Sequence, residues 1–124
     1  MATLNTTLSL SSTDISADET LSISLTDALS VLGQSFSFQV VTSSTGTVFA
    51  AAANYTKSYV LLYNTSTTAS EIITIEKADS GDEYMELAGG EYAFFPWSSD
   101  VDLAADAESG TPTLEVRIFQ AAAS

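Results

Sequence analysis

The sequence predicts an all-β protein, an antiparallel β-sandwich or jelly roll of about eight short strands, in one domain over residues 1–124. Apolar and polar residues alternate with a period of two in most segments, which is typical of strands with one buried face. Polar turns separate these segments at intervals of roughly 8–12 residues, as in two-sheet folds. The apolar fraction of 45% supplies enough side chains for a single core.

The first half of the chain contains the clearest alternation. Strands are expected over 4–10, 21–25, 36–40, 47–53 and 58–63. The last of these is aromatic and β-branched, so we expect a central strand. A turn at 42–46 and a polar loop at 64–70 border the last two strands. Thr26 can cap a single helical turn over 27–32, which Gly33 would end.

The second half is more regular, with strands expected over 72–76, 84–87, 92–95 and 113–119. Paired glycines make 88–91 the tightest turn, since glycine adopts positive φ at little cost. Pro96 cannot donate to a strand ladder, so the third of these strands ends there or lies at a sheet edge. The acidic segment 98–111 is expected to be irregular, with a possible short helix over 101–107. The tail 120–124 should fray.

Missing residue types exclude most familiar active sites. The chain has no histidine and no cysteine, and only three basic residues, Lys57, Lys77 and Arg117. Histidine is the usual general base and metal ligand, and cysteine is the most readily activated nucleophile. We therefore expect no enzyme and no cofactor.

The formal net charge of −13 bears on the choice of partner. Three cations cannot neutralise a phosphate backbone, so we expect no nucleic-acid partner and no binding to anionic membranes. Met1 to Leu10 lacks the features of a signal peptide, and the longest apolar runs are too short to span a bilayer. A soluble protein is the expectation.

Carboxylates provide the remaining candidates for chemistry. A glycosidase pair could come from Glu83, Glu86, Glu91 and Asp100, close in sequence to the sugar-stacking candidates Tyr84, Tyr92 and Trp97. Calcium could bind two acidic loops, one with Asp79, Asp82 and Glu83 and the other with Asp100, Asp102 and Asp106. Turn propensity and a solvated surface explain the same acids without a site, and we predict no metal site. Two serine–lysine pairs are also candidates for a nucleophile, Lys57 with Ser58 and Lys77 with Ser80. The surrounding acids would keep each lysine protonated, so it could not activate the serine.

Aromatic residues after the paired glycines suggest an interface. Alternation places Phe95 and Trp97 on one strand face, and Tyr92 and Phe94 on the other. Tyrosine and tryptophan are enriched at interface hot spots, although the core is the commoner location for any one of them. The candidate interface residues are Tyr84, Tyr92, Phe94 and Trp97.

The segment from Ser58 to Phe119 resembles small β-rich virion proteins of tailed bacteriophages, namely head decoration (cement) proteins and short fibre or knob modules. The resemblance covers about half of the chain and rests on a strand ending in asparagine, a second strand, a Gly-Glu turn and a proline. The residues that carry it are Tyr59-Val60-Leu61-Leu62-Tyr63-Asn64, Glu71-Ile72-Ile73-Thr74-Ile75, Leu87-Ala88-Gly89-Gly90-Glu91-Tyr92-Ala93-Phe94-Phe95-Pro96 and Gly110-Thr111-Pro112-Thr113-Leu114-Glu115-Val116-Arg117-Ile118.

The resemblance implies a structural virion protein, assembled in the host cytoplasm, that forms homo-oligomers and binds a major capsid protein or another virion protein. A capsid decoration protein that stabilises the phage head is the first expectation. The alternative is a tail-fibre module that binds a receptor or carbohydrate, for which Tyr84, Tyr92 and Trp97 would surround a groove. No catalytic residue comes with the resemblance.

Overall fold

The structure, a computed structural model, describes residues 2–41 and 46–122. Its strands are β1 (Ala2–Ser12), β2 (Leu21–Val40), β3 (Thr47–Ala50), β4 (Ser58–Asn64), β5 (Ile73–Lys77), β6 (Glu83–Leu87), β7 (Tyr92–Trp97), β8 (Leu103–Ala107) and β9 (Thr113–Ala121). A single 3₁₀ turn, Ala52–Asn54, follows β3. The all-β prediction is confirmed.

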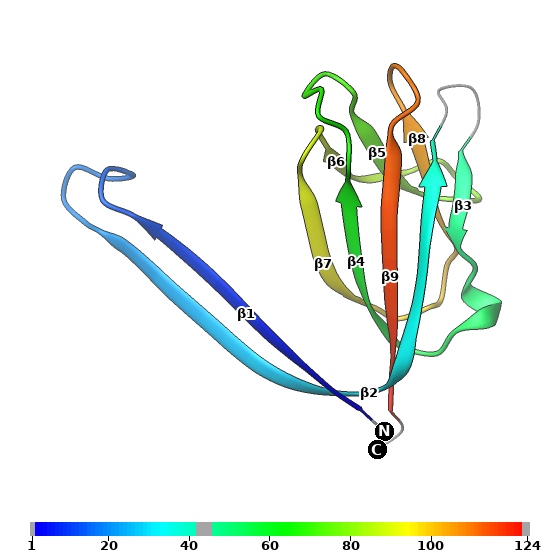
Figure 1. Cartoon of the computed structure of the whole chain (residues 1–124), viewed down its shortest axis with the longest axis horizontal. Helices are drawn as coiled ribbons and strands as arrows, with labels where there is room; N and C mark the ends of the chain where they lie inside the picture. Colours follow the sequence, from blue (N-terminus) through cyan, green and yellow to red (C-terminus); the bar gives the residue numbers. More distant parts are fainter. Residues whose placement is uncertain (1, 42–45, 123–124) are drawn as a thin grey trace.

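Two antiparallel sheets form the fold, with strand orders β1-β2-β9-β4-β7 and β3-β8-β5-β6. We call them sheet A and sheet B. From β2 onward the first strand pairs with the last, β3 with β8, β4 with β7, and β5 with β6. This nested pairing is a long hairpin rolled into two layers, which is the jelly-roll arrangement. The layers are visible in Figure 1.

The inner faces of the two sheets meet in one core. Leu62 and Val116 contribute from sheet A, and Ile73 and Ile75 contribute from sheet B, each at most 1% exposed. Leu114, Val116 and Ile118 point inward from β9, as alternation predicts, while Glu115 and Arg117 lie on the other face. The body of the molecule is therefore a β-sandwich stabilised by apolar burial.

Asn64 joins the two sheets at the end of β4. Its side chain is fully buried and its Nδ2 donates to the carbonyls of Glu71 (2.8 Å) and Leu87 (2.9 Å). Its Oδ1 accepts from the backbone N–H of Ser66 at 3.0 Å. The neighbouring turn contains the predicted glycine pair, where Gly90 has φ +90°. A Cβ on Gly89 would lie only 2.3 Å from the carbonyl oxygen of Thr68.

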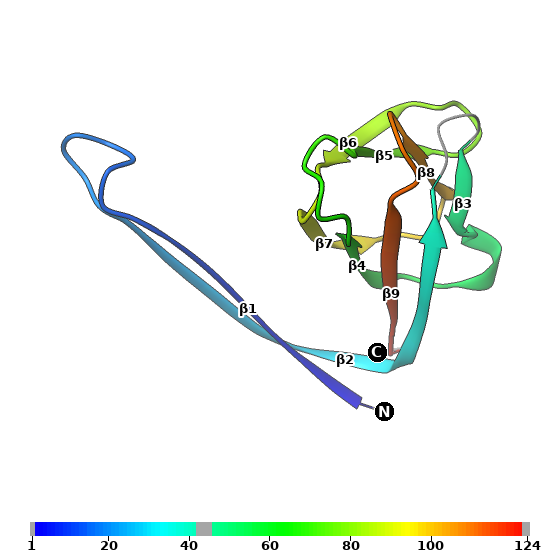
Figure 2. The same ribbon diagram turned by 45° about the horizontal axis from the view of Figure 1, so that its top comes forward.

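β1 and the first half of β2 leave the sandwich as a long hairpin, which we call the arm. The pairing runs from Ala2 with Val31 to Ser12 with Leu21. Figures 1 and 2 show the arm projecting from the body, with its tip far from both sheets. β9 pairs with β2 only from Val31 onward, so no third strand supports the arm.

A β-bulge in β2 marks the junction between the arm and the body. Val31 and Gly33 pair with the consecutive residues Ala121 and Gln120, which leaves Leu32 as the extra residue. Bulges bend a strand and change which of its residues share a face. The odd-numbered residues of β2 before the bulge therefore share a face with Phe36 and Phe38 after it.

Two predicted helical turns are wrong. Residues 27–32 belong to β2, where cross-strand pairing with β1 overrides the Thr26 cap, and Gly33 lies at the bulge. Residues 103–107, expected to be irregular or helical, form the buried strand β8 between β3 and β5. Small apolar residues there favour helix in isolation, but packing in the sheet decides the outcome.

The other strand predictions hold with two changes. The expected strands 21–25 and 36–40 are parts of the single strand β2, and the expected strand 47–53 ends at Ala50, before the 3₁₀ turn. With the unexpected β8, the described residues form nine strands. Pro96 lies within β7, which is the edge strand of sheet A. The predicted turn at 42–46 lies mostly outside the described residues. The start of the expected frayed tail, Gln120 and Ala121, is paired in β9, while 123 and 124 lie outside the description.

Candidate interaction surface

The outer face of sheet A is built from three cross-strand rows rich in aromatic side chains. Register places one row across β2, β9, β4 and β7 at Phe36, Arg117, Leu61 and Phe94. The flanking rows are Gln34, Phe119, Tyr59 and Pro96 on one side, and Phe38, Glu115, Tyr63 and Tyr92 on the other. Tyr92 is 67% exposed and Phe38 is 58% exposed, so no layer formed by residues 2–41 and 46–122 covers the face.

One ion pair lies in the middle of this face. Arg117 Nε donates to Glu115 Oε2 at 2.8 Å, and Arg117 Nη1 donates to Gln34 Oε1 at 3.0 Å. The guanidinium also lies over the Phe36 ring, 4.0 Å from its centroid. These contacts hold the cation flat against the sheet. The three rows therefore carry one positive and one negative charge on a largely apolar face, and Lys57 Nζ lies over the Tyr59 ring, 5.5 Å from its centroid.

The arm is amphipathic, with a leucine-rich face and a hydroxyl-rich face. Leu8 pairs with Leu25, and Leu10 pairs with Ile23, so paired residues share one side of the ribbon. The rest of this leucine face comprises Ala2, Leu4, Thr6, Ser12, Leu21, Asp27, Leu29 and Val31. The opposite side carries Thr3, Asn5, Thr7, Ser9, Ser11, Ser22, Ser24, Thr26, Ala28 and Ser30. The distal part of the leucine face remains uncovered, with Leu8, Leu10, Ile23 and Leu25 at 41–60% exposure, whereas Val31 at its base is buried.

The leucine face of the arm and the outer face of sheet A border a common groove. Its volume is about 550 Å³. Leu8 and Leu25 form one wall together with Thr6, Thr7, Thr26 and Asp27, and Leu61, Tyr92, Ala93 and Phe94 form the other. The bulge keeps the leucine face and the outer face of sheet A on the same side of β2. The groove is therefore apolar on the side of sheet A, while its arm wall mixes leucines with hydroxyls and one carboxylate.

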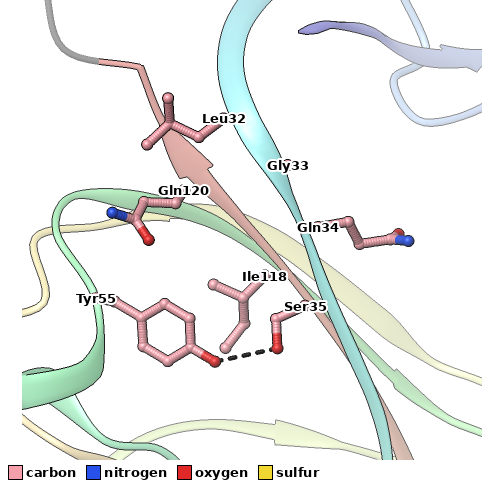
Figure 3. A pocket seen from close by; sticks show the side chains of 7 residues that line it. All are labelled: Leu32, Gly33, Gln34, Ser35, Tyr55, Ile118 and Gln120. Carbon is pink, nitrogen blue, oxygen red and sulfur yellow. Dashed lines mark hydrogen bonds between the residues drawn. The ribbon is translucent and has the colours of Figure 1, made fainter. Parts of the chain in front are cut away.

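A smaller pocket of about 260 Å³ lies beneath the junction (Figure 3). Leu32 and Gly33 of the bulge border it, and Ile118 forms part of its apolar lining. The Tyr55 hydroxyl lies 3.1 Å from Ser35 Oγ and hydrogen-bonds to it. This contact ties β2 to the segment after the 3₁₀ turn, immediately after the bulge. It helps to anchor the base of the arm.

The outer face of sheet B differs in being acidic. Cross-strand register places Asp106, Thr74 and Glu86 in one row, and Ala104, Glu76 and Glu83 in the next. Partial burial raises the pKa of the Glu76 carboxyl, and the negative charges of Asp106 and Glu83 raise that pKa further. Asp106 Oδ1 is buried without a hydrogen-bond partner. A basic partner would be attracted here rather than to sheet A.

The structure separates the four predicted interface residues. Tyr92 and Phe94 lie together on the outer face of sheet A. Tyr84 is 51% exposed on β6 of sheet B. Trp97 is only 5% exposed; its ring packs edge-on against Tyr55 and its Nε1 donates to the Val101 carbonyl at 3.2 Å. Trp97 is therefore a core residue, and the expected groove between Tyr84, Tyr92 and Trp97 does not form.

The two acidic loops approach each other more closely than the sequence indicates. Asp79, Asp100 and Asp102 border one shallow hollow of about 440 Å³. The Asp102 carboxylate already accepts from the backbone N–H of Ala52 at 2.7 Å. Across residues 2–41 and 46–122, no three acidic side chains converge as a cation-binding set.

The remaining catalytic candidates also have ordinary structural contacts. Glu91 accepts from the backbone N–H of Ala88 at 2.7 Å and closes the glycine turn. Ser58 is buried and its hydroxyl donates to the Thr56 carbonyl at 2.8 Å. Lys77 pairs with Asp79 at 3.5 Å, while the Ser80 hydroxyl donates to Asp82. Neither predicted serine–lysine pair is therefore joined by a hydrogen bond in this structure.

Sequence reasoning missed the arm and most of the aromatic face. The missed residues with the greatest bearing on interaction are Leu8, Leu10, Ile23 and Leu25 on the arm, and Phe36, Phe38, Leu61 and Tyr63 on sheet A. Alternation in the body half of β2 points the wrong way, because its inner set, Ser35, Ser37 and Gln39, is polar while Phe36, Phe38 and Val40 face outward. The sequence pattern alone would place these apolar side chains in the core.

None of the helical structure described for this chain has the length and apolar character of a membrane-spanning segment. Comparisons with protein-family models, curated proteins and solved structures gave no match.

Proposed function

We propose that this protein is a structural virion protein, a capsid decoration (cement) protein of a tailed bacteriophage that forms homo-oligomers and stabilises the head. The single observation that carries the assembly role is the arm, whose leucine face is exposed. A two-stranded ribbon is marginally stable alone in water, so this face needs a partner. The virion setting rests on the resemblance of residues 58–119 to small phage β-proteins.

The fold and the charge support the same proposal. Jelly rolls serve as capsid domains of viruses, although they also occur in lectins and other proteins, so this support is an analogy. An acidic subunit suits the outside of a capsid, where packaged DNA is not its partner. Repetition on a symmetric particle would add avidity to a modest contact. No catalytic step enters this function.

The alternative is a receptor- or carbohydrate-binding module of a tail fibre. The exposed aromatic rings of Tyr63, Tyr92 and Phe94 on one sheet face favour it, because flat aromatic surfaces can stack against sugar rings. These three residues replace the expected set of Tyr84, Tyr92 and Trp97, because Trp97 is buried. Binding of the purified protein to a glycan array, abolished by Tyr92→Ala, would support the alternative.

The test of the assembly role is the solution mass by light scattering over a range of concentrations, together with co-sedimentation with phage capsids. The double variant Leu8→Ser/Leu25→Ser should shift the protein toward monomer. The matched control is Ser9→Ala/Ser24→Ala, which changes the adjacent pair on the hydroxyl-rich side, outside the groove lining, and should leave the mass unchanged. A wild-type protein that stays monomeric and does not sediment with capsids would refute the proposal.

A further inference from the structure

We propose that the outer face of sheet A is the receptor for the arm of a second copy of this chain, so that two molecules clasp each other reciprocally. This inference rests on the proposed assembly function and specifies its contact. The donor surface is the leucine face of the arm. The acceptor surface is the set of rows centred on Leu61 and Phe94.

Charge permits a second copy to dock at these two surfaces. Two molecules of this protein, each with a net charge of −13, repel one another over most of their surface. The strands of the arm carry a single charge, Asp27 on the leucine face, and the loop at the tip adds Asp14, Asp18 and Glu19. On sheet A, Glu115 and Arg117 cancel each other, and Lys57 lies over the Tyr59 ring. The arm strands of one copy would therefore bring a single carboxylate to a face of the other copy that has no excess of negative charge.

Size and shape also match. A strand of eleven residues is about 37 Å long, and two paired strands are about 10 Å wide. The four body strands of sheet A offer an acceptor about 19 Å wide, and β4 is about 24 Å long. An arm that lies along these strands would therefore be covered over about 24 Å of its length. Two reciprocal contacts of about 24 by 10 Å would bury about 1,000 Å² in total, which is the lower limit for a specific protein interface.

The geometry of the junction keeps the arm of the same chain away from this face. The groove between Leu25 and Phe94 remains open at about 550 Å³. β2 is hydrogen-bonded to β9 up to the bulge, and Tyr55 holds Ser35 beneath it, so closing the groove would strain the base of the arm. A second molecule can enter this open groove with its own arm while offering its groove in return.

The absence of native cysteine permits a direct test by disulfide cross-linking. Leu10→Cys protein is mixed with mass-tagged Phe94→Cys protein under mild oxidation, and the mixed disulfide is quantified by mass spectrometry. Leu10 and Phe94 are 47% and 41% exposed, so both substitutions should fold. Docking raises the local thiol concentration, and the mixed disulfide should form at least about tenfold faster than in the controls.

Two controls separate docking from random collision. Ser9→Cys places the thiol on the hydroxyl-rich side of the arm, and Tyr84→Cys places it on sheet B instead of sheet A. Rapid mixed disulfides only for Leu10→Cys with Phe94→Cys support the clasp. Equal rates in all pairings, or products that join two arms through Leu10→Cys alone, overturn it.

A second measurement separates failure of the inference from failure of the proposed function. Phe94→Asp should weaken self-association by about thirtyfold, the effect of losing one interface hot spot, while Tyr84→Asp should not. One outcome rejects only the proposed acceptor surface. In that outcome the wild type oligomerises and Leu8→Ser/Leu25→Ser dissociates it, but Phe94→Asp does not. The assembly role then stands, and the outer face of sheet A is not the acceptor. A monomeric wild type refutes the clasp, and it refutes the assembly role as well if the protein also fails to sediment with capsids. An internal disulfide in monomeric Leu10→Cys/Phe94→Cys protein shows the arm closing on its own sheet and also overturns the clasp.

Discussion

The arm and the sandwich share one alternating sequence pattern, but the apolar side chains of the pattern are buried in the sandwich and exposed in the arm. In β9, Leu114, Val116 and Ile118 are at most 2% exposed because sheet B covers them. In the arm, Leu8 and Leu25 occupy equivalent alternating positions and remain 45% and 60% exposed. The pattern specifies which side of a strand avoids water, but it does not specify which surface provides the cover. In the sandwich that surface belongs to the same chain, and for the arm it has to come from elsewhere.

One Leu→Ala substitution in each region should give the largest difference in the free energy of unfolding. Leu62→Ala leaves a cavity in the closed core and should lower the free energy of unfolding by about 2–5 kcal/mol. Leu25→Ala removes an exposed side chain and should cost less than about 1 kcal/mol in the monomer. Urea denaturation at low protein concentration measures both. Equal losses would mean that the arm is packed in the monomer.

Asparagines in the two regions provide the next contrast. Asn64→Ala leaves the carbonyls of Glu71 and Leu87 without their donor and should cost about 3 kcal/mol. Asn5→Ala changes an exposed side chain on the hydroxyl-rich face of the arm, and its effect should stay within about 0.5 kcal/mol. Thermal unfolding of both variants tests this. A mild Asn64→Ala variant would show that the two sheets do not depend on this residue for their attachment.

The junction between the regions should tolerate one substitution. Nothing lies within 4 Å of a Cβ added to Gly33, and this glycine is absent from the positive-φ positions. Gly33→Ala should therefore change the free energy of unfolding by less than about 1 kcal/mol, through the entropy of the unfolded chain. Hydrogen exchange of the arm amides is the companion measurement. A large loss of stability would indicate that the bend depends on glycine.

The smallest predicted effect is a change of stability with pH, and it comes from Glu76 on the acidic outer face of sheet B. The raised pKa of Glu76 means that the folded protein keeps a proton that the unfolded chain has already lost. Stability should therefore fall slightly as pH rises from the ordinary carboxyl pKa to the raised one, and stay level above it. Glu76→Gln should remove this slope and be slightly more stable at neutral pH. Denaturation midpoints across this window test the sign, with exposed Glu86→Gln as the control.

Most of the sandwich could be predicted from the sequence because its strands follow a local rule. β5 and β9 alternate, and their apolar sides are the buried ones. β4 is rich in aromatic and β-branched residues, which also favours a strand. β8 could not be predicted, because its run of alanines has no alternation and becomes a strand only between β3 and β5. The unbroken length of β2 was missed for a related reason: the Thr26–Gly33 segment carries local helix signals that its pairing with β1 overrides.

The candidate surface was only partly predictable. Tyr92 and Phe94 were placed together correctly on one face by alternation along β7. The rows that make them part of a larger face depend on the order β2-β9-β4-β7, which joins segments distant in sequence. Alternation places Trp97 on the opposite face of β7 from Tyr92 and Phe94. Only the presence of sheet B over that face shows that Trp97 belongs to the core. Long-range pairing, rather than local composition, decided each of these outcomes.

The continuity of β2 has a mechanical consequence. A pull on a docked arm would travel along one covalent strand into the body, where β2 lies at the edge of sheet A and pairs with β9. Antiparallel hydrogen bonds run perpendicular to the strands, so this force loads the β2–β9 ladder in shear and strains its bonds together rather than one by one. Each subunit would then act as a link whose load-bearing element is also its fold-closing strand. Tension between neighbouring copies would be carried by the strongest direction of the sheet.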